Sequence, residues 1–319
     1  MKINRFMIAA PKSGSGKTMI TCALLQLLKD SGKNVLSYKC GPDYIDPMFH
    51  KKVLGVPSKN LDTFFTDEKT TVQLFLDERA DGDFAVLEGV MGLYDGLGGI
   101  YEQGSSYHLA KVTQTPIILV VDAKGMGKSV LALIAGFLQY DTQHLIKGVL
   151  INRMSKGYYD IIKPLIEKEL SVKVVGYFPE QKDIGLSSRH LGLVMPDELS
   201  DIKKQLNETA DRLKKTIDMD LFIDIAEAAD EIGDSESADK DKRQTLKNAE
   251  LMRPQDQNNT VNIAVAMDEA FCFYYEDNLR MLEKCGAKLQ YFSPLHDTSL
   301  PENCDAMLLG GGFSGLCVK

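Results

Sequence analysis

The sequence predicts an α/β fold built on a doubly wound, mainly parallel β-sheet. Short runs rich in Val, Ile and Leu alternate with helical patterns through the first two thirds of the chain, which is typical of βαβ units. These runs are continuous rather than alternating, as expected for strands buried on both faces. A glycine-rich loop also separates the first run from the first helical pattern, as in folds that bind phosphates at a helix N-terminus.

Six strands are expected in the first part of the chain, with helices between them. The helical patterns include Thr18–Asp30 and Val130–Gln139. The expected strands are Phe6–Ala10, Asn34–Tyr38, Phe84–Leu87, Ile117–Asp122, Gly148–Ile151 and Lys173–Phe178. Right-handed crossovers then place helices on both faces of one parallel sheet.

Composition changes twice in the last third of the chain. Residues 198–229 have a helical pattern, whereas Asp230–Asn259 is polar and contains no aromatic residue, so it cannot bury enough apolar surface to offset the entropy of ordering. A second α/β pattern follows: strand Val261–Met267, helix Asp277–Lys284, and strands Ala287–Phe292 and Asp305–Leu309. The expected organisation is domain 1–229, charged linker 230–259, and an incomplete domain 260–319.

Composition and charge exclude several classes of protein. The 319 residues carry a net charge of −8, with a pI near 5.3, which argues against a general nucleic-acid binder or a polybasic membrane protein. The apolar runs are shorter than the ~20 residues of a membrane-spanning helix, and the N-terminus lacks a signal-peptide pattern. The six cysteines form no CxxC pair, so we expect a reduced, cytoplasmic protein without a zinc site.

The strongest local motif is a P-loop, in the segment APKSGSGKT of residues 10–18. It keeps the Gly16-Lys17-Thr18 ending, although Pro11 replaces the usual first glycine. In such a loop, backbone N–H groups surround the phosphates, Lys17 reaches the terminal phosphates, and the Thr18 hydroxyl binds Mg²⁺. The motif therefore predicts a P-loop α/β fold that binds the phosphates of a ligand together with Mg²⁺.

Two acidic segments are expected to face this loop. Asp43 and Asp46 follow a strand in GPDYIDP, and in open α/β sheets the loops after the strands form the site. They could hold Mg²⁺ or position a substrate nitrogen, although an Asp/Pro turn explains the same residues. Glu88 ends an apolar strand, which is the Walker-B arrangement of a Mg²⁺ ligand. The glycines that follow, from Gly89 onward, allow a loop to close over substrate.

Two weaker signals stay open at this level. Asn152 ends a buried strand, where its amide could read an adenine edge or simply cap a strand–helix turn. Arg189 and His190 place two potential cations beside an apolar turn, and the residues alone assign them no role.

The order of these motifs resembles that of the cobyrinic acid a,c-diamide synthase family. The shared segments are APKSGSGKT, KCGPDYIDPMFH, NLDTFF, VLEGVMGLYDG, VVDAKGMGKS, GVLINRM, VVGYFPE and SSRHLGLV. The segment from AVAMDEAF to LLGGGF also resembles the start of that family's glutamine amidotransferase domain. The resemblance implies a dethiobiotin synthetase-like fold followed by the first βαβ part of a flavodoxin-like glutaminase domain.

The resemblance implies an ATP- and Mg²⁺-dependent ligase. Such an enzyme phosphorylates a carboxylate of a corrinoid tetrapyrrole, and ammonia then attacks the acyl phosphate to give an amide. The implied ATP site consists of Ser13, Gly14, Ser15, Gly16, Lys17 and Thr18, with Asn152 at the adenine. The implied Mg²⁺ ligands are Thr18, Asp43 and Glu88, and Lys17, Asp43, Asp46 and Glu88 are the implied catalytic residues. The substrate candidates are Tyr44, Gly89, Tyr94, Arg189 and His190.

The family carries a complete glutaminase domain, whereas this sequence stops at Lys319. Cys317 lacks the following turn and the helix that would activate a nucleophilic thiol. We therefore expect no glutaminase nucleophile in this chain and a need for free ammonia or a separate glutaminase. A homodimer is compatible with the fold, although no sequence pattern favours it.

Three alternatives remain at the level of sequence. A related enzyme amidates nickel-sirohydrochlorin with the same motifs. A P-loop ATPase switch could dimerise through Lys12, although GPDYIDP argues against it. A non-catalytic remnant would expose unpaired strand edges and associate.

Overall fold

The structure is a computed structural model that describes residues 2–77, 84–181, 199–232 and 260–313. The chain divides into two compact units, residues 1–233 and 234–319. Each unit has its own sheet, and the two are described separately.

The first unit contains a seven-stranded parallel sheet in the order β3-β2-β4-β1-β5-β6-β7. The strands are β1 (Arg5–Ala9), β2 (Val35–Cys40), β3 (Ser58–Leu61), β4 (Phe84–Glu88), β5 (Ile117–Asp122), β6 (Ile146–Asn152) and β7 (Lys173–Phe178). From β1 the chain passes to β2 and β3 on one side, returns to β4 next to β1, and then continues to β5, β6 and β7 on the other side, so the direction of winding reverses beside β1. In open α/β sheets the ligand crevice lies at this reversal, outside the carboxyl ends of the strands.

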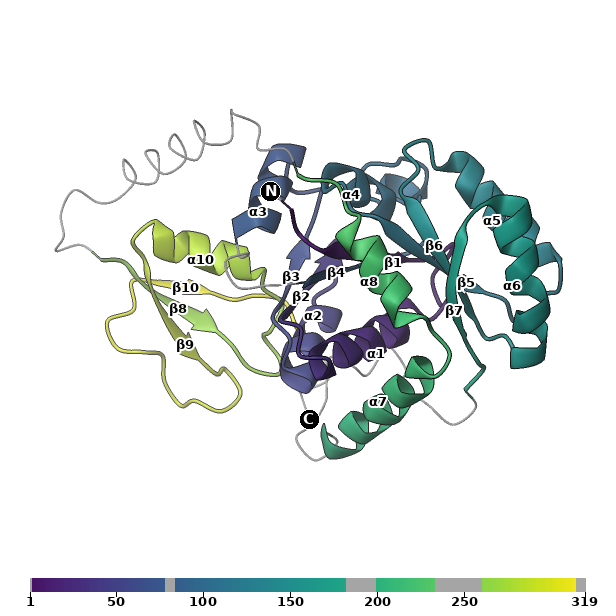
Figure 1. The fold of residues 1–319 in the computed structure, drawn as a ribbon. Helices are drawn as coiled ribbons and strands as arrows, with labels where there is room; N and C mark the ends of the chain where they lie inside the picture. The colour runs from purple at the N-terminus through teal and green to yellow at the C-terminus, as the bar shows by residue number, and fades with distance from the viewer. Residues whose placement is uncertain (1, 78–83, 182–198, 233–259, 314–319) are drawn as a thin grey trace. The chain divides into compact units, whose positions relative to one another are not determined.

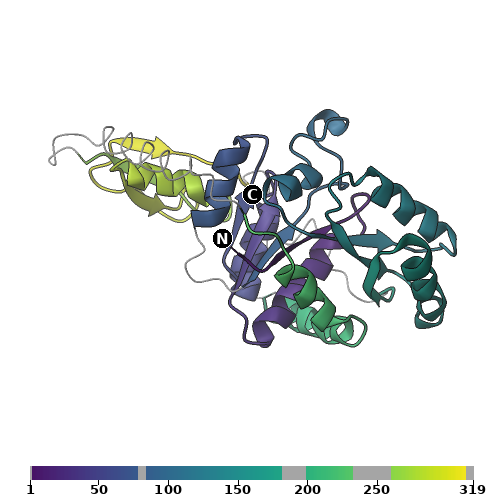
Figure 2. The same cartoon turned by 45° about the horizontal axis from the view of Figure 1, so that its top comes forward.

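Helices cover both faces of this sheet (Figure 1). One face carries α1 (Lys17–Asp30), the π-helical turn η1 (His50–Leu54), α7 (Leu199–Lys214) and α8 (Met219–Glu227). The other face carries α3 (Glu68–Asp77), α4 (Ser106–Val112), α5 (Ser129–Tyr140) and α6 (Lys156–Leu170). Figure 2 shows α7 and α8 in green on the same side as the purple α1. No helix among the described residues is both long enough and apolar enough to cross a membrane.

The two hydrophobic layers explain the continuous apolar runs of the sequence. In β1, Phe6 and Ile8 pack toward the α1 face, whereas Met7 and Ala9 pack toward the opposite face. A strand covered on both sides needs an apolar residue at every position. The predicted doubly wound parallel fold is confirmed, and each of the six predicted strands overlaps an observed strand.

One strand of this unit was not predicted. Strand β3 is short and partly polar, Ser-Lys-Asn-Leu, and pairs only with β2 at the sheet edge. The helical pattern over 198–229 corresponds to two helices, α7 and α8. Between them, Ile217 bridges to Gly176 of β7, and Asp218 then caps α8 by accepting from the Leu221 N–H.

The compact unit extends past the predicted boundary at residue 229. Arg5 is fully buried and donates to the Asp230 carbonyl, and Ile232 packs in the core. Residues 230–232 therefore belong to the first unit, and the rest of the predicted linker lies outside the described residues.

The second unit has a three-stranded parallel sheet in the order β10-β8-β9. Its elements are β8 (Asn262–Ala266), α10 (Glu276–Lys284), β9 (Lys288–Phe292) and β10 (Ala306–Leu308). All four were expected from the sequence. Gly312 packs tightly against the backbone of Ala270. A Cβ at position 312 would stand 2.0 Å from the Ala270 carbonyl oxygen, so this position requires glycine.

Candidate active site

The P-loop joins β1 to α1 at the strand-order reversal. Gly14 and Gly16 have left-handed backbone angles, with φ of 74° and 92°, which glycine adopts without strain. Gly16 is the N-cap of α1 and makes no side-chain cap. Because the first N–H groups of a helix have no partner within the helix, this end of α1 is arranged to bind an anion.

Lys17 is tied to the loop that follows β4. Its side chain is buried and its Nζ donates to the Met91 carbonyl at 2.5 Å. Burial, together with the nearby charge of Lys39, lowers the pKa of Lys17 to about 8. The side chain of Lys17 therefore links the P-loop to the loop after Glu88 through a hydrogen bond.

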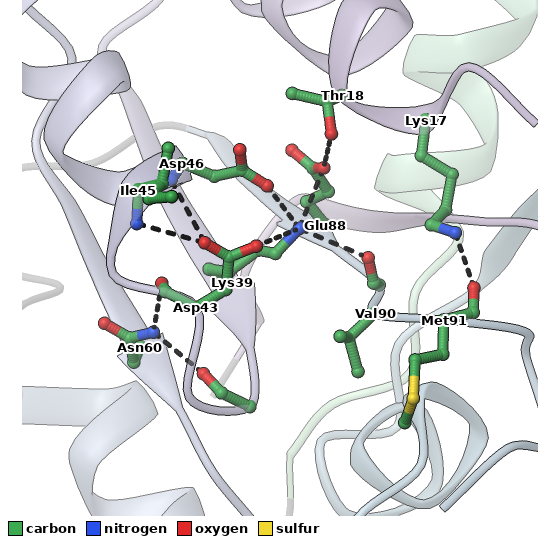
Figure 3. Close-up of polar contacts among 12 residues, drawn as sticks. Lys17, Thr18, Lys39, Asp43, Ile45, Asp46, Asn60, Glu88, Val90 and Met91 are labelled. Carbon is green, nitrogen blue, oxygen red and sulfur yellow. Dashed lines mark hydrogen bonds and ion pairs between the residues drawn. The ribbon is translucent and has the colours of Figure 1, made fainter. Parts of the chain in front are cut away.

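Lys39 is the centre of a buried ionic cluster (Figure 3). Its Nζ lies 2.5 Å from Asp46 Oδ2, 2.9 Å from Glu88 Oε1 and 3.5 Å from Asp43 Oδ2. Burial lowers the pKa of Lys39, but Glu88, Asp46 and Asp43 together raise it above its usual value. The cluster thus places one ammonium group among three carboxylates at the carboxyl ends of β2 and β4.

The two aspartates have different surroundings. Asp43 is about a third exposed, with a side-chain exposure of 32%, and its Oδ1 accepts from the Ile45 and Asp46 N–H groups. These bonds give a partner to the first two N–H groups of α2 (Ile45–Phe49), whose N-cap residue is Tyr44. Burial raises the pKa of both aspartates, helped by Asp46 at Asp43 and by Glu88 at Asp46. Asp43 is therefore the carboxylate of this pair that solvent and small solutes can reach.

Asn60 holds the GPDYIDP loop in place. Its Nδ2 donates to the Gly41 carbonyl at 2.8 Å and to the Asp43 carbonyl at 2.9 Å. It can do so because β3 pairs with β2 in a register that sets Asn60 opposite Lys39. The edge strand that was not predicted therefore positions the acidic loop.

Glu88 connects the acidic cluster to the P-loop. Its side chain is fully buried, and Oε1 accepts from the Thr18 hydroxyl at 2.7 Å as well as from Lys39. On its other side, Oε2 lies 3.8 Å from Nε2 of the buried His50. Burial lowers the pKa of His50 to about 4, so its imidazole is neutral near pH 7.

Asn152 contacts the P-loop itself. Its Nδ2 donates to the Ser15 carbonyl at 2.8 Å, and its Oδ1 accepts from the Arg153 N–H. A Cβ at Gly16 would stand 2.4 Å from Asn152 Nδ2, so the close approach requires glycine. The side-chain amide of Asn152, which was expected to contact adenine, is buried and hydrogen-bonded to the P-loop.

The remaining predicted residues fall into three groups. Tyr44 is half-buried at the N-terminus of α2. Gly89 packs against Ser106, because a Cβ at position 89 would stand 2.7 Å from the Ser106 Oγ. Tyr94 stacks on Phe137 and donates to its carbonyl, so its contacts are those of a packing residue. The remaining candidates lie outside the described residues: Arg189, His190 and Cys317.

Sequence reasoning missed three residues of the site: Lys39, Asn60 and His50. Lys39 had a detectable signal, because a lysine near the end of a buried strand requires compensating acids. His50 ends the KCGPDYIDPMFH segment but had no assigned role. Asn60 had no signal, since its importance depends on the pairing of β3 with β2.

The oxygen atoms present fit a magnesium ion only together with phosphate. Within the described ranges, no group of three or more His, Cys, Asp or Glu side chains is arranged to hold a metal. Mg²⁺ is commonly bound by one or two carboxylates plus substrate phosphates. The adjacent Thr18 hydroxyl and Glu88 carboxylate match that pattern.

Large apolar side chains are exposed on the two loops that follow β3 and β4. The two loops lie close together at Gly104 and Phe64. A Cβ placed at Gly104 would stand 3.5 Å from the Cβ of Phe64. The exposed residues are Phe64, Phe65, Met91, Leu97, Ile100 and Tyr101. Exposed apolar side chains that lie together often mark a binding surface.

Comparison with protein families gives two matches. Residues 6–194 match the CobQ/CobB/MinD/ParA nucleotide binding domain. Residues 262–316 match the CobB/CobQ-like glutamine amidotransferase domain. The predicted P-loop domain and the start of an amidotransferase domain are thereby confirmed.

The chain is similar to curated cobyrinate a,c-diamide synthases. It is 38% identical to the protein of Listeria innocua over 99% of this chain and 67% of that protein. It is 39% identical to the protein of Thermoplasma acidophilum over 98% of this chain and 67% of that protein. The solved structure of the MinD cell division protein of Aquifex aeolicus superposes loosely, with a TM-score of 0.41 and 17% identity over 66% of this chain and 97% of that one. The chain spans about two thirds of the curated relatives' length and belongs to the cobyrinate a,c-diamide synthase family of ATP-dependent amidoligases.

Proposed function

We propose that this chain amidates the a- and c-side-chain carboxylates of cobyrinic acid in cobalamin biosynthesis, through an acyl-phosphate intermediate. The observation that carries the proposal is the contact between the P-loop and the acidic cluster, made by Thr18 and Lys39 on the same oxygen of Glu88. A phosphate donor at the P-loop and a carboxylate beside Asp43 would then meet in one site.

The chemistry needs two successive displacements. The substrate carboxylate oxygen attacks the γ-phosphorus, the bond to the β–γ bridging oxygen breaks, and ADP leaves. Ammonia then attacks the acyl carbon, the bond to the phosphoryl oxygen breaks, and phosphate leaves as hydrogen phosphate, with the proton that the nitrogen loses. Lys17 would neutralise charge on the terminal phosphates, and the partly exposed Asp43 would hold the incoming nitrogen. Mg²⁺ held by Thr18 and Glu88 would supply further charge stabilisation when bound.

The exposed apolar loops support a large, flat substrate. A tetrapyrrole presents a broad apolar face, and the aromatic rings of Phe64 and Phe65 lie 5.0 Å apart on the loop after β3. Apolar contact there would leave a peripheral carboxylate free to enter the acidic cluster. The rings would thus contribute binding energy away from the reacting atoms.

The test is ADP release by the 319-residue chain with Mg²⁺-ATP and cobyrinic acid, followed by mass spectrometry of the corrinoid. Ammonium and glutamine are supplied separately, and Glu88→Gln is the matched inactive control. We expect diamide with ammonium and none with glutamine. Amidation of nickel-sirohydrochlorin but not of cobyrinic acid would replace the proposed substrate. ADP release without any amide would contradict the reaction itself.

A further inference from the structure

The imidazole of His50 faces Oε2 of Glu88, whereas Thr18 of the P-loop contacts the other oxygen, Oε1. His50 is fully buried in η1, and its Nδ1 lies 2.9 Å from Ser37 Oγ and 3.4 Å from Ser58 Oγ. These serines stand opposite each other on β2 and β3. Two hydroxyl groups from neighbouring strands thus converge on one ring nitrogen.

Each of the facing atoms of His50 and Glu88 lacks a hydrogen bond. Among the described residues, His50 Nε2 and Glu88 Oε2 are both buried polar atoms without a hydrogen-bond partner. They lie 3.8 Å apart, roughly 0.8 Å more than an ordinary N–H···O bond. A buried polar atom without a hydrogen bond loses its contact with water and gains nothing in return, so a small approach that pairs the two atoms is favoured.

The groups on the two sides of the imidazole differ in their hydrogen-bonding capacity. A neutral imidazole has one N–H and one acceptor nitrogen. The serine hydroxyls at Nδ1 can donate or accept, whereas the carboxylate oxygen facing Nε2 can only accept. The tautomer with its proton on Nε2 therefore satisfies both sides, with a serine hydroxyl donating to Nδ1.

We infer that His50 is a positioning residue that donates from Nε2 to Glu88 Oε2 and so keeps Oε1 directed at Thr18 and Lys39. This inference rests on the proposed function for its catalytic consequence. Glu88 Oε1 then accepts from Thr18 and Lys39, while Glu88 Oε2 is held by the imidazole of His50. Mutating a residue that orients a ligating side chain typically lowers activity by ~10–100-fold.

The kinetic test compares His50→Leu with His50→Gln. The glutamine side chain can place an N–H donor near the position of Nε2, whereas leucine fills the space without one. We expect His50→Leu to lower kcat for ammonium-dependent ADP release by ~10–100-fold, with little change in the KM for ATP. His50→Gln should recover most of that loss. The matched control is His296→Leu, which removes the histidine of an exposed His–Glu pair in the second unit and should leave the rate unchanged.

A second measurement is independent of turnover. The ¹⁵N shifts of the His50 ring in the nucleotide-free chain should show the proton on Nε2, and the Ser37→Ala, Ser58→Ala double variant should weaken that preference. A proton on Nδ1 would overturn the inference, as would equal losses of activity in His50→Leu and His50→Gln. If the wild type amidates no tetrapyrrole, the proposed function fails while the ring shifts still decide the role of His50.

Discussion

Asn152 donates from its side-chain amide to the carbonyl of Ser15, at 2.8 Å, across 137 residues of sequence. The bond joins the end of β6 to the phosphate loop, and Gly16 has left-handed backbone angles directly against the same amide. The asparagine therefore fixes the loop that binds phosphate, in addition to any contact with a nucleotide.

Replacing Asn152 by Ala should weaken nucleotide binding by about tenfold, because the Ser15 carbonyl loses a buried donor. If Asn152 acts through the P-loop, affinity for ATP and for GTP should fall equally in titration calorimetry. If it reads adenine, ATP should lose affinity and GTP should not. Asn278→Ala, on the exposed side of α10, is the control and should bind like the wild type.

Replacing Lys39 by Met should destabilise the first unit by about 3–5 kcal/mol, because the carboxylates of Asp46 and Glu88 would remain buried without their cation. Urea unfolding followed by far-UV circular dichroism measures this, since the chain has no tryptophan. Lys156→Met removes an exposed pair with Asp160 and should leave the urea midpoint close to that of the wild type, because an exposed ion pair adds little stability. Equal midpoints for the two variants would contradict the central role of Lys39.

Replacing Phe65 by Ser should raise the KM for the tetrapyrrole several-fold while kcat at saturation changes little. The ring is 67% exposed, so its loss removes contact with substrate and costs little folding energy. Ile161→Ser on α6, at 65% exposure, is the matched control. An unchanged KM in Phe65→Ser would show that the aromatic loop does not contact the substrate.

Replacing Arg5 by Met should lower the free energy of unfolding of the first unit by about 1–3 kcal/mol. The buried guanidinium donates to the carbonyls of Ile3, Thr113, Gln114 and Asp230, and methionine leaves these acceptors unpaired. Arg280→Met, which removes an exposed pair with Glu276 in the second unit, should change stability by less than about 0.5 kcal/mol. Chemical denaturation of both variants decides the matter, and similar effects would contradict the bridging role of Arg5.

The sequence by itself determined the features that are local along the chain. The continuous apolar runs predict strands buried on both faces, and the GKT ending predicts a phosphate loop because its backbone and side chains act within nine consecutive residues. The order of motifs also identified the family. These signals are readable because secondary structure and the P-loop depend on neighbours in sequence.

Only the tertiary structure decided how the site is assembled. The pairing of β2 with β4 sets Lys39 beside Glu88 in register, and the edge strand β3 brings Asn60 to the acidic loop. Likewise, Asn152 at the end of β6 meets Ser15 of the P-loop, and His50 of η1 meets Ser37 of β2. Hydrophobic patterning specifies that a segment is a buried strand but not which strand lies next to it. The contacts that follow from strand order and register could therefore be seen only once the sheet was complete.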